Sequence, residues 1–287
     1  MKLAENRVCN LELYPGEGEV ASPLILDYLP QRDELAGCGT FGEFDRSCYS
    51  LRPGSPEAWQ PLSSLAQDHC NLLISTRSHV SPELGWFVFG HEGTVCQSDT
   101  NFGDLFIADL LTNADNEWTV SPVASPYPNG YPASSCSVLL NPTTVMVTGG
   151  YDNDMTTLDM CFLLDLNTMT WTKVAPMLKP RQDHTCVVTV DGEVLIAAGQ
   201  DASVHVYNPA TNSWREEQDL PDQVTTFYES ALLLLNGMPS FVEVDTDKIW
   251  QRQEDGSWEM MDVSLGAEFD GFFDHLVPVP AGLYQCP

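Results

Sequence analysis

Two neighbouring stretches of the sequence repeat one pattern and decide the fold. Residues 135–176 read SCSVLLNPTTVMVTGGYDNDMTTLDMCFLLDLNTMTWTKVAP, and residues 185–217 read TCVVTVDGEVLIAAGQDASVHVYNPATNSWREE. Each contains an apolar run, a short turn, a second apolar run that ends at glycine, a polar loop, an alternating run and a turn into tryptophan. Short runs bounded by turn residues predict four strands in each unit.

Tryptophans mark the same unit along the rest of the chain. Turn-rich segments precede five of them, which are Trp59, Trp118, Trp171, Trp214 and Trp258. A lone sheet of four short strands cannot bury both of its faces, so repeats of this kind are stable when they pack against one another in a ring. The sequence therefore predicts an all-β protein built from repeated four-stranded sheets.

The units resemble the kelch repeat family in three features. The second strand of the third unit ends at Gly149-Gly150, and that of the fourth unit ends at Gly199. Six residues separate Tyr207 from Trp214. Glycine permits positive φ and close backbone approach, and the two aromatic side chains can pack between neighbouring sheets.

The resemblance implies one domain, residues 1–287, folded as a six-bladed kelch-type β-propeller closed by an N-terminal strand. The blades are expected at about residues 22–65, 69–125, 134–178, 184–222 and 228–264, and at 272–287 completed by residues 6–15. The last unit contains only two expected strands before the chain stops. Residues 6–15 therefore have to supply the missing part of the sixth blade.

This arrangement implies two disulfides. Cys38 ends the second strand of the first blade and Cys48 begins its third, which makes them neighbours across a hairpin. Cys286 and Cys9 take the corresponding places in the sixth blade, so a bond between them would lock the ring. The alternative is that all nine cysteines of the chain are reduced, buried thiols.

Three further cysteines begin first strands, which line the central channel of a propeller. They are Cys70, Cys136 and Cys186, in units two, three and four. We interpret them as a repeated small residue in a crowded taper, and a soft-metal site is the alternative. Cys96 and Cys161 have no assignment, and the sequence leaves open how any of these five cysteines pair.

The charge balance limits the partners. The chain carries 41 acidic and 12 basic side chains, a net charge of −29, spread without acidic blocks. Nucleic acids and anionic membranes need clustered lysine and arginine, so both are excluded as partners. We expect cationic or neutral partners. A homo-oligomer would have to overcome self-repulsion, so its association should strengthen as salt rises.

The apolar runs and the cysteine count of the chain indicate in which cellular compartment the protein is expected. No apolar run is long enough for a signal peptide or a membrane span. The chain is therefore expected to be a mature secreted protein or a cytoplasmic one, and the cysteine count favours the secreted, extracellular form.

The sequence contains no recognisable catalytic motif, so no enzyme, catalytic residue, metal or cofactor is predicted. Hydrolase, zincin, NTPase and dinucleotide motifs are missing, and the metal patterns of kelch-type enzymes are not matched. Asp152, Asp154 and Asp159 invite a calcium interpretation, but the EF-hand template fails. We interpret that segment as a solvated loop, with bound calcium as the alternative.

Aromatic residues in the expected loops provide the best functional hint. A candidate binding rim comprises Phe41, Phe44, Phe102, Tyr127, Tyr131, Phe227, Tyr228, Phe272 and Phe273. Such a rim could bind a protein or a small-molecule ligand. The predicted function is a non-enzymatic extracellular binding or assembly module. The alternatives are a carrier of an apolar small molecule or pigment, and a small propeller enzyme with a metal site.

Overall fold

The structure is a computed structural model that describes residues 25–39, 46–52, 59–66, 77–91, 105–112, 117–130, 132–224, 230–243, 246 and 248–262. Its strands form five antiparallel four-stranded sheets, and consecutive strands of the chain are neighbours in every sheet. Within these residues no helix is long and apolar enough to cross a membrane. The all-β prediction is confirmed.

Each sheet is one blade and contains four strands in chain order. Blade 1 contains β1 (Ile25–Leu29), β2 (Glu34–Cys38), β3 (Cys48–Leu51) and β4 (Gln60–Leu62), and blade 2 contains β5 (Arg77–Ser81), β6 (Gly85–His91), β7 (Leu105–Thr112) and β8 (Trp118–Ala124). Blade 3 contains β9 (Cys136–Asn141), β10 (Thr144–Thr148), β11 (Cys161–Asp165) and β12 (Thr170–Val174). Blade 4 contains β13 (Thr185–Val188), β14 (Val194–Ala197), β15 (Val204–Asn208) and β16 (Ser213–Glu216), and blade 5 contains β17 (Ala231–Leu235), β18 (Met238–Glu243), β19 (Lys248–Arg252) and β20 (Trp258–Met260).

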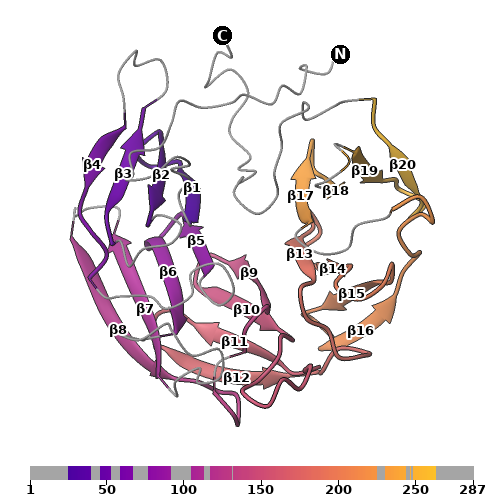
Figure 1. The fold of residues 1–287 in the computed structure, drawn as a ribbon, viewed down its shortest axis with the longest axis horizontal. Helices are drawn as coiled ribbons and strands as arrows, with labels where there is room; N and C mark the ends of the chain where they lie inside the picture. Colours follow the sequence, from indigo (N-terminus) through magenta and orange to yellow (C-terminus); the bar gives the residue numbers. More distant parts are fainter. Residues whose placement is uncertain are drawn as a thin grey trace.

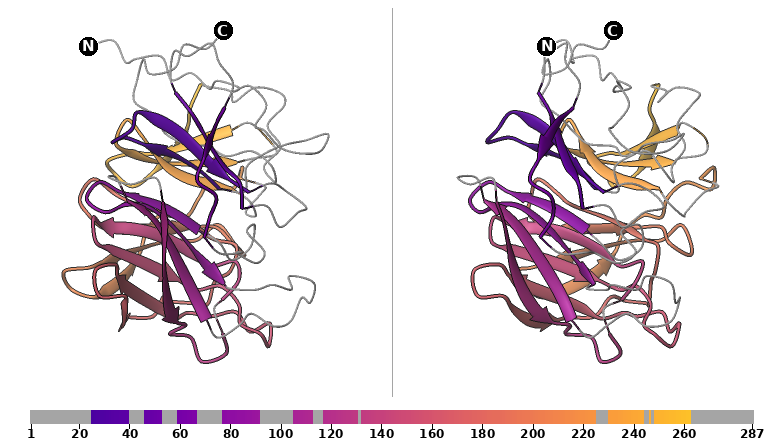
Figure 2. Two further views of the ribbon diagram at one scale, coloured as in Figure 1. Left: turned by 90° about the vertical axis from the view of Figure 1, so that its left-hand side faces the viewer. Right: turned by 60° about the vertical axis from the view of Figure 1, so that its left-hand side comes forward.

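The blades are arranged radially around a central axis (Figure 1), and their sheets are twisted (Figure 2). First strands face the centre and contact one another in series, from β1 through β5, β9 and β13 to β17. The structure describes five blades rather than the predicted six. The predicted sixth blade falls on residues 6–15 and 272–287, which lie outside the described residues.

The glycines act as predicted at the ends of second strands. Gly149, Gly150 and Gly199 have φ values of 57°, 91° and 94°. A Cβ atom at Gly150 would lie 2.5 Å from the carbonyl oxygen of Ala133, and one at Gly199 would lie 2.5 Å from that of Gln182. Side chains there would collide with the segment that enters the blade's own first strand.

Apolar side chains fill the seams between blades. Separate clusters join blades 1 and 2, blades 2 and 3, blades 3 and 4, and blades 4 and 5. Removing buried apolar surface from water stabilises each seam, because a single sheet could not cover its own faces. The blades therefore pack against one another through apolar faces, as the repeat pattern predicted.

Tryptophans connect blades 2, 4 and 5 to the blade that precedes each of them. The Nε1–H of Trp214 donates to the carbonyl of Ala175 at 2.9 Å, and its ring lies 5.1 Å from that of Tyr207. Trp118 donates in the same way to Ser63 at 2.8 Å. Trp258 donates to Gln218 at 3.2 Å. In all three cases the acceptor lies just beyond the fourth strand of the preceding blade.

Candidate functional site

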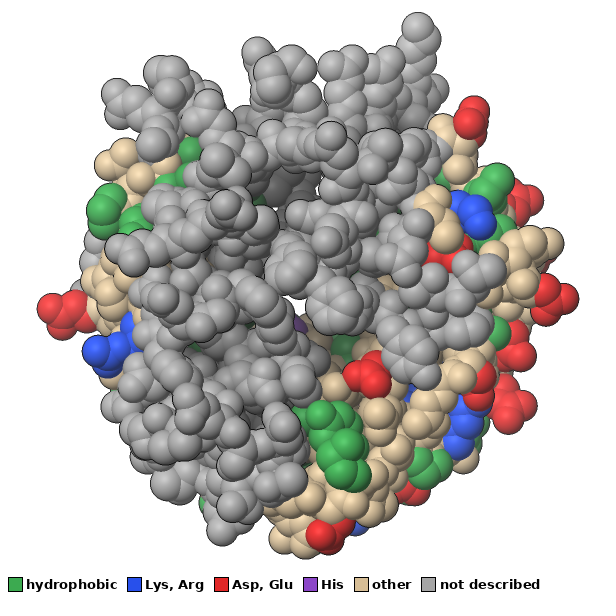
Figure 3. Space-filling view, viewed as in Figure 1, with side chains coloured by type: hydrophobic (Ala, Val, Ile, Leu, Met, Phe, Trp, Pro, Cys, Tyr) green, Lys and Arg blue, Asp and Glu red, His purple; other side chains and the backbone are tan. Residues whose placement is uncertain are grey.

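Two sets of connections lie on the same end of the blades, which we call the loop face. One set joins second to third strands, and the other joins fourth strands to the next first strand. In blades 3 and 4 the described loop-face segments are residues 149–160, 175–184 and 198–203. Hydrophobic side chains gather in one patch where blade 3 meets blade 4 (Figure 3).

Most of the predicted aromatic rim lies outside the described residues. This applies to Phe41, Phe44, Phe102, Tyr131, Phe227, Tyr228, Phe272 and Phe273. Tyr127 is described, and it is only 4% exposed. Its ring packs edge-on against Phe162 with centroids 4.7 Å apart, inside the core between blades 2 and 3. The prediction that Tyr127 belongs to an exposed rim is therefore wrong, because the seam buries its ring.

Two disulfides are present among the described residues. Cys38 and Cys48 face each other in the register of β2 and β3 and are bonded, as predicted. The predicted Cys9–Cys286 bond lies outside the described residues. Cys161 is buried and free. Burial raises the pKa of its thiol, so this thiol is chemically unreactive at neutral pH.

The second disulfide joins Cys136 of β9 to Cys186 of β13. The sequence left the pairing of these two cysteines open. Their bond makes the soft-metal alternative wrong for both, because neither sulfur is a thiolate. Cys70 lies outside the described residues. Sequence analysis missed the bond because 50 residues separate the partners. Their equivalent positions in adjacent repeats are the signal that could have revealed it, since first strands of adjacent blades are neighbours.

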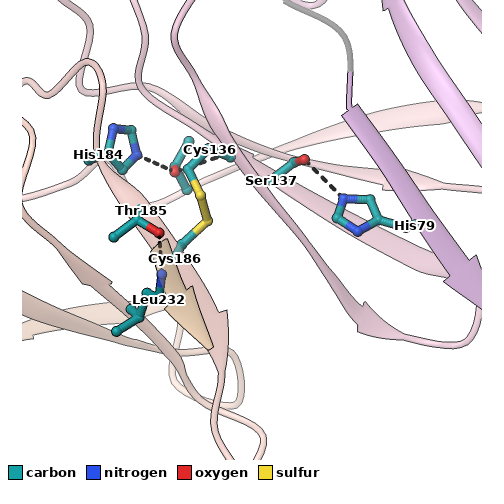
Figure 4. The surroundings of a disulfide bond; sticks show 8 residues. His79, Cys136, Ser137, His184, Thr185, Cys186 and Leu232 are labelled. Atoms are coloured by element: carbon teal, nitrogen blue, oxygen red, sulfur yellow. Dashed lines mark hydrogen bonds between the residues drawn. A yellow bond between two sulfur atoms is a disulfide. The ribbon is translucent and has the colours of Figure 1, made fainter. Parts of the chain in front are cut away.

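Polar side chains beside this disulfide also connect neighbouring blades (Figure 4). His79 Nε2 lies 2.9 Å from Ser137 Oγ, between blades 2 and 3. His184 Nε2 lies 2.8 Å from the hydroxyl of Thr148, between blades 4 and 3. The hydroxyl of Thr185 accepts a 2.9 Å hydrogen bond from the Leu232 amide of blade 5. No group of three metal-ligating side chains occurs in the part of the chain that the structure describes.

A half-buried carboxylate connects blades 1 and 2. Asp27 of β1 accepts a 2.7 Å hydrogen bond from Trp86 Nε1 of β6. Burial raises the pKa of Asp27 to about 6, and hydrogen bonds from Ser78 and Trp86 oppose that shift. This carboxyl group therefore changes its charge within the mildly acidic range.

The loop between β10 and β11 is held rigidly by Asp152. Its side chain is buried, and Oδ1 accepts hydrogen bonds from the amides of Asp154 and Thr156, both at 3.0 Å. Oδ2 accepts a 3.1 Å bond from Asn129, which also reaches Asp154. Asp152 thus organises its own loop and connects it to the neighbouring one through Asn129.

Arg181 is a fully buried arginine at the loop face. It is 1% exposed and enters blade 4 from the segment that connects blade 3 to blade 4. Its guanidinium donates to the carbonyls of Ala198 and Ser203 at 2.8 and 3.0 Å, and to the Ser203 hydroxyl at 2.5 Å. No local sequence pattern indicated this role, because the acceptors belong to the next repeat.

Comparisons with known proteins agree with this geometry. The kelch motif model matches residues 184–221, which contain blade 4. Beta-scruin of Limulus polyphemus is 34% identical over 88 residues, covering 27% of this chain and 10% of beta-scruin. The chain thus matches only about a tenth of the length of that relative. The motif, this similarity and the radial arrangement of four-stranded sheets support a kelch-repeat β-propeller.

Proposed function

We propose that this propeller is a non-enzymatic extracellular binding module, closed as a six-bladed ring by its N-terminal strand. Kelch propellers are typically protein-interaction modules. The observation that carries the proposal is the Cys136–Cys186 disulfide between adjacent first strands, because it makes the blade 3–blade 4 seam a covalent one. A seam of this kind holds the neighbouring loop-face segments in place before a partner arrives, which reduces the entropy lost on binding.

Disulfide chemistry supports the extracellular assignment. Cys38–Cys48 and Cys136–Cys186 would be reduced by the thiol pools of the cytosol and persist in oxidising compartments. The proposed Cys9–Cys286 bond would add a third link, between the two ends of the chain. We therefore propose that an extracellular setting keeps these disulfides oxidised, and that the oxidised disulfides hold the blades in place for binding or assembly.

Net charge supports the choice of partner. At −29, the surface attracts cationic proteins and repels polyanions over distances of about 10 Å at moderate salt. Two copies of this chain repel each other for the same reason. We therefore propose cationic or neutral partners, and homo-oligomers that form more readily as salt rises.

Mass spectrometry of the full chain tests the compartment and the binding class together. Three disulfides should leave three of the nine cysteines open to alkylation in denaturant without reductant, and all nine open after reduction. Nine labelled cysteines before reduction would contradict the disulfides and the extracellular assignment. The expected native mass is that of the oxidised chain, or a whole-number multiple of it, with no bound ligand. A co-purified pigment would favour the carrier alternative, and bound copper or iron would favour the enzyme.

A further inference from the structure

Two exposed apolar side chains lie on the loop face where blades 3 and 4 meet. Met155 is 64% exposed and Leu178 is 50% exposed. Among the described residues, the other large apolar side chains with comparable exposure are Val190 and Met260, at 71% and 58%. Val190 lies in the turn between β13 and β14, and Met260 lies on the outer strand β20, so both are away from this part of the loop face.

Met155 is held in a conformation that its side chain does not favour. Its φ is 59°, in the left-handed region where glycine or asparagine is the usual residue. Its amide donates to the Asp152 carbonyl at 2.9 Å, and Asp152 fixes the amides on either side of it. Strained backbone with a solvent-exposed apolar side chain costs free energy in the isolated protein and is typical of binding positions.

The loops that carry these two side chains are joined to each other. The amides of Met177 and Arg181 donate to the carbonyls of Asp159 and Leu158, at 2.9 and 3.0 Å. Thr157 also donates through its hydroxyl to Gln182, at 2.8 Å. Leu178 lies two residues from each of two exposed prolines, Pro176 and Pro180, whose rings fix φ at those two positions of its loop. The two apolar groups are therefore presented by one connected and rigid surface, which we call the Met155–Leu178 patch.

Acidic side chains predominate around this patch. Its two loops, residues 150–160 and 175–184, contain four acids, Asp152, Asp154, Asp159 and Asp183, and two bases, Lys179 and Arg181. Arg181 is buried and Lys179 is bound to Asp201, so neither offers a free cation to a partner. The two loops therefore combine two exposed apolar side chains with an excess of acids, of which Asp154 is exposed, Asp159 and Asp183 are half-buried and Asp152 is buried.

From this combination we propose that the Met155–Leu178 patch is the docking surface for a protein segment that presents an apolar side chain beside lysine or arginine. The inference rests on the proposed binding function and names its site and the chemistry of its partner. Burial of the two apolar side chains supplies the affinity. Attraction between the partner's cations and Asp154 and its acidic neighbours supplies orientation and speeds association.

A random dodecapeptide phage library, selected on the oxidised full chain, tests this surface. Enriched peptides would be synthesised and their affinities measured by fluorescence polarisation for three proteins. These are the wild type, a patch variant with Met155→Ser and Leu178→Ser, and a control variant with Val190→Ser and Met260→Ser. All four side chains are exposed, so the three proteins should have matching unfolding midpoints.

Enriched peptides should combine an apolar residue with lysine or arginine and should lose about tenfold or more in affinity for the patch variant. The control variant should bind as the wild type does, and binding should weaken as salt rises from about 0.05 M to about 0.5 M. Equal affinity for the patch variant, or selection of acidic peptides, would overturn the patch while leaving the binding function intact. If no peptide is enriched over the empty support, both the patch and the proposed binding function are contradicted.

Discussion

Blades 1 and 4 hold the base of the same loop by different chemistry. In blade 1 the end of β2 is bonded to the start of β3 through Cys38–Cys48, across a loop in which the partners are 10 residues apart. In blade 4 the corresponding place is one residue beyond the Ala197–Val204 pair, at Ala198 and Ser203. There the Arg181 guanidinium connects both carbonyls.

The two devices differ in what they depend on. The cystine belongs to its own blade and lasts only where thiols are oxidised. Arg181 comes from the segment that connects blade 3 to blade 4, so the loop of blade 4 is held only when that connecting segment is in place. The comparison teaches that the loop of a blade can be held either by a bond within the blade or by the segment that precedes it. Breaking each device separately should expose the difference.

Loss of Arg181 should have the largest effect. In Arg181→Ala the carbonyls of Ala198 and Ser203 and the Ser203 hydroxyl lose their buried donor, so the free energy of unfolding should fall by about 3 to 5 kcal/mol. Urea denaturation of the oxidised protein measures this loss. Arg181→Lys is the matched variant, because it keeps the charge but has a single donor group, and it should lose less. A change under about 1 kcal/mol in Arg181→Ala would show that the guanidinium does not hold the loop.

The two disulfides should differ in size of effect. Loop-closure entropy predicts a loss of about 4 kcal/mol for Cys136→Ala with Cys186→Ala, where 50 residues separate the partners. Cys38→Ala with Cys48→Ala should lose about 3 kcal/mol, because that loop is shorter. Thermal unfolding with and without a dithiol reductant checks both. The inter-blade pair should have the larger effect, and the opposite order would mean that native-state contacts, and not chain entropy, set the values.

A fall in pH should change the free energy of unfolding in opposite directions through one group in blade 4 and one in blade 1. Burial, together with the nearby positive charges of Arg181 and Lys179, lowers the pKa of His205 in blade 4 to about 4. Unfolded His205 therefore binds a proton between about pH 4 and 6.5 that the folded form rejects, so this group makes the fold less stable as pH falls. Asp27 in blade 1, with its pKa raised to about 6, takes up a proton when folded, so it makes the fold more stable as pH falls through 6.

Replacing these groups one at a time separates the two slopes. His205→Gln should reduce the loss of stability on acidification by about 1 to 2 kcal/mol, and Asp27→Asn should increase it by a similar amount. Urea midpoints from pH 4 to pH 7 supply the measurement. Slopes that move in the same direction in both variants would contradict the assigned burial of one of the two groups.

Outer-strand ion pairs should have the smallest effect. Arg215 of β16 forms a bidentate pair with Glu193, and Glu217 connects it to Arg252 of blade 5. Arg215 is about half exposed, so Arg215→Gln should cost under about 1 kcal/mol at low salt and less at high salt. Unfolding midpoints at two salt concentrations decide the matter. A loss of unfolding free energy as large as that of Arg181→Ala, and equal at both salt concentrations, would contradict this expectation.

The sequence predicted the strands and turns within each repeat, but it did not predict the bonds that join residues of different repeats. The strands, the glycines at 149, 150 and 199, and the Tyr207–Trp214 contact follow from local patterns. Arg181 and the Cys136–Cys186 bond connect different repeats, so the ring itself has to be known before they can be assigned. Tyr127 was misplaced for a related reason, because a pattern can place an aromatic residue in a loop but does not reveal that the loop folds into a seam.

The three tryptophan hydrogen bonds between blades all point the same way along the chain, from a later blade to an earlier one. Trp118, Trp214 and Trp258 each donate to a carbonyl just after the blade that precedes them in the chain. During synthesis the acceptor therefore emerges before its donor, and every such bond closes onto a blade that has already been made. A chain that grows from the N-terminus can assemble its propeller one blade at a time, in the order of translation, with each new outer strand fastening to completed structure.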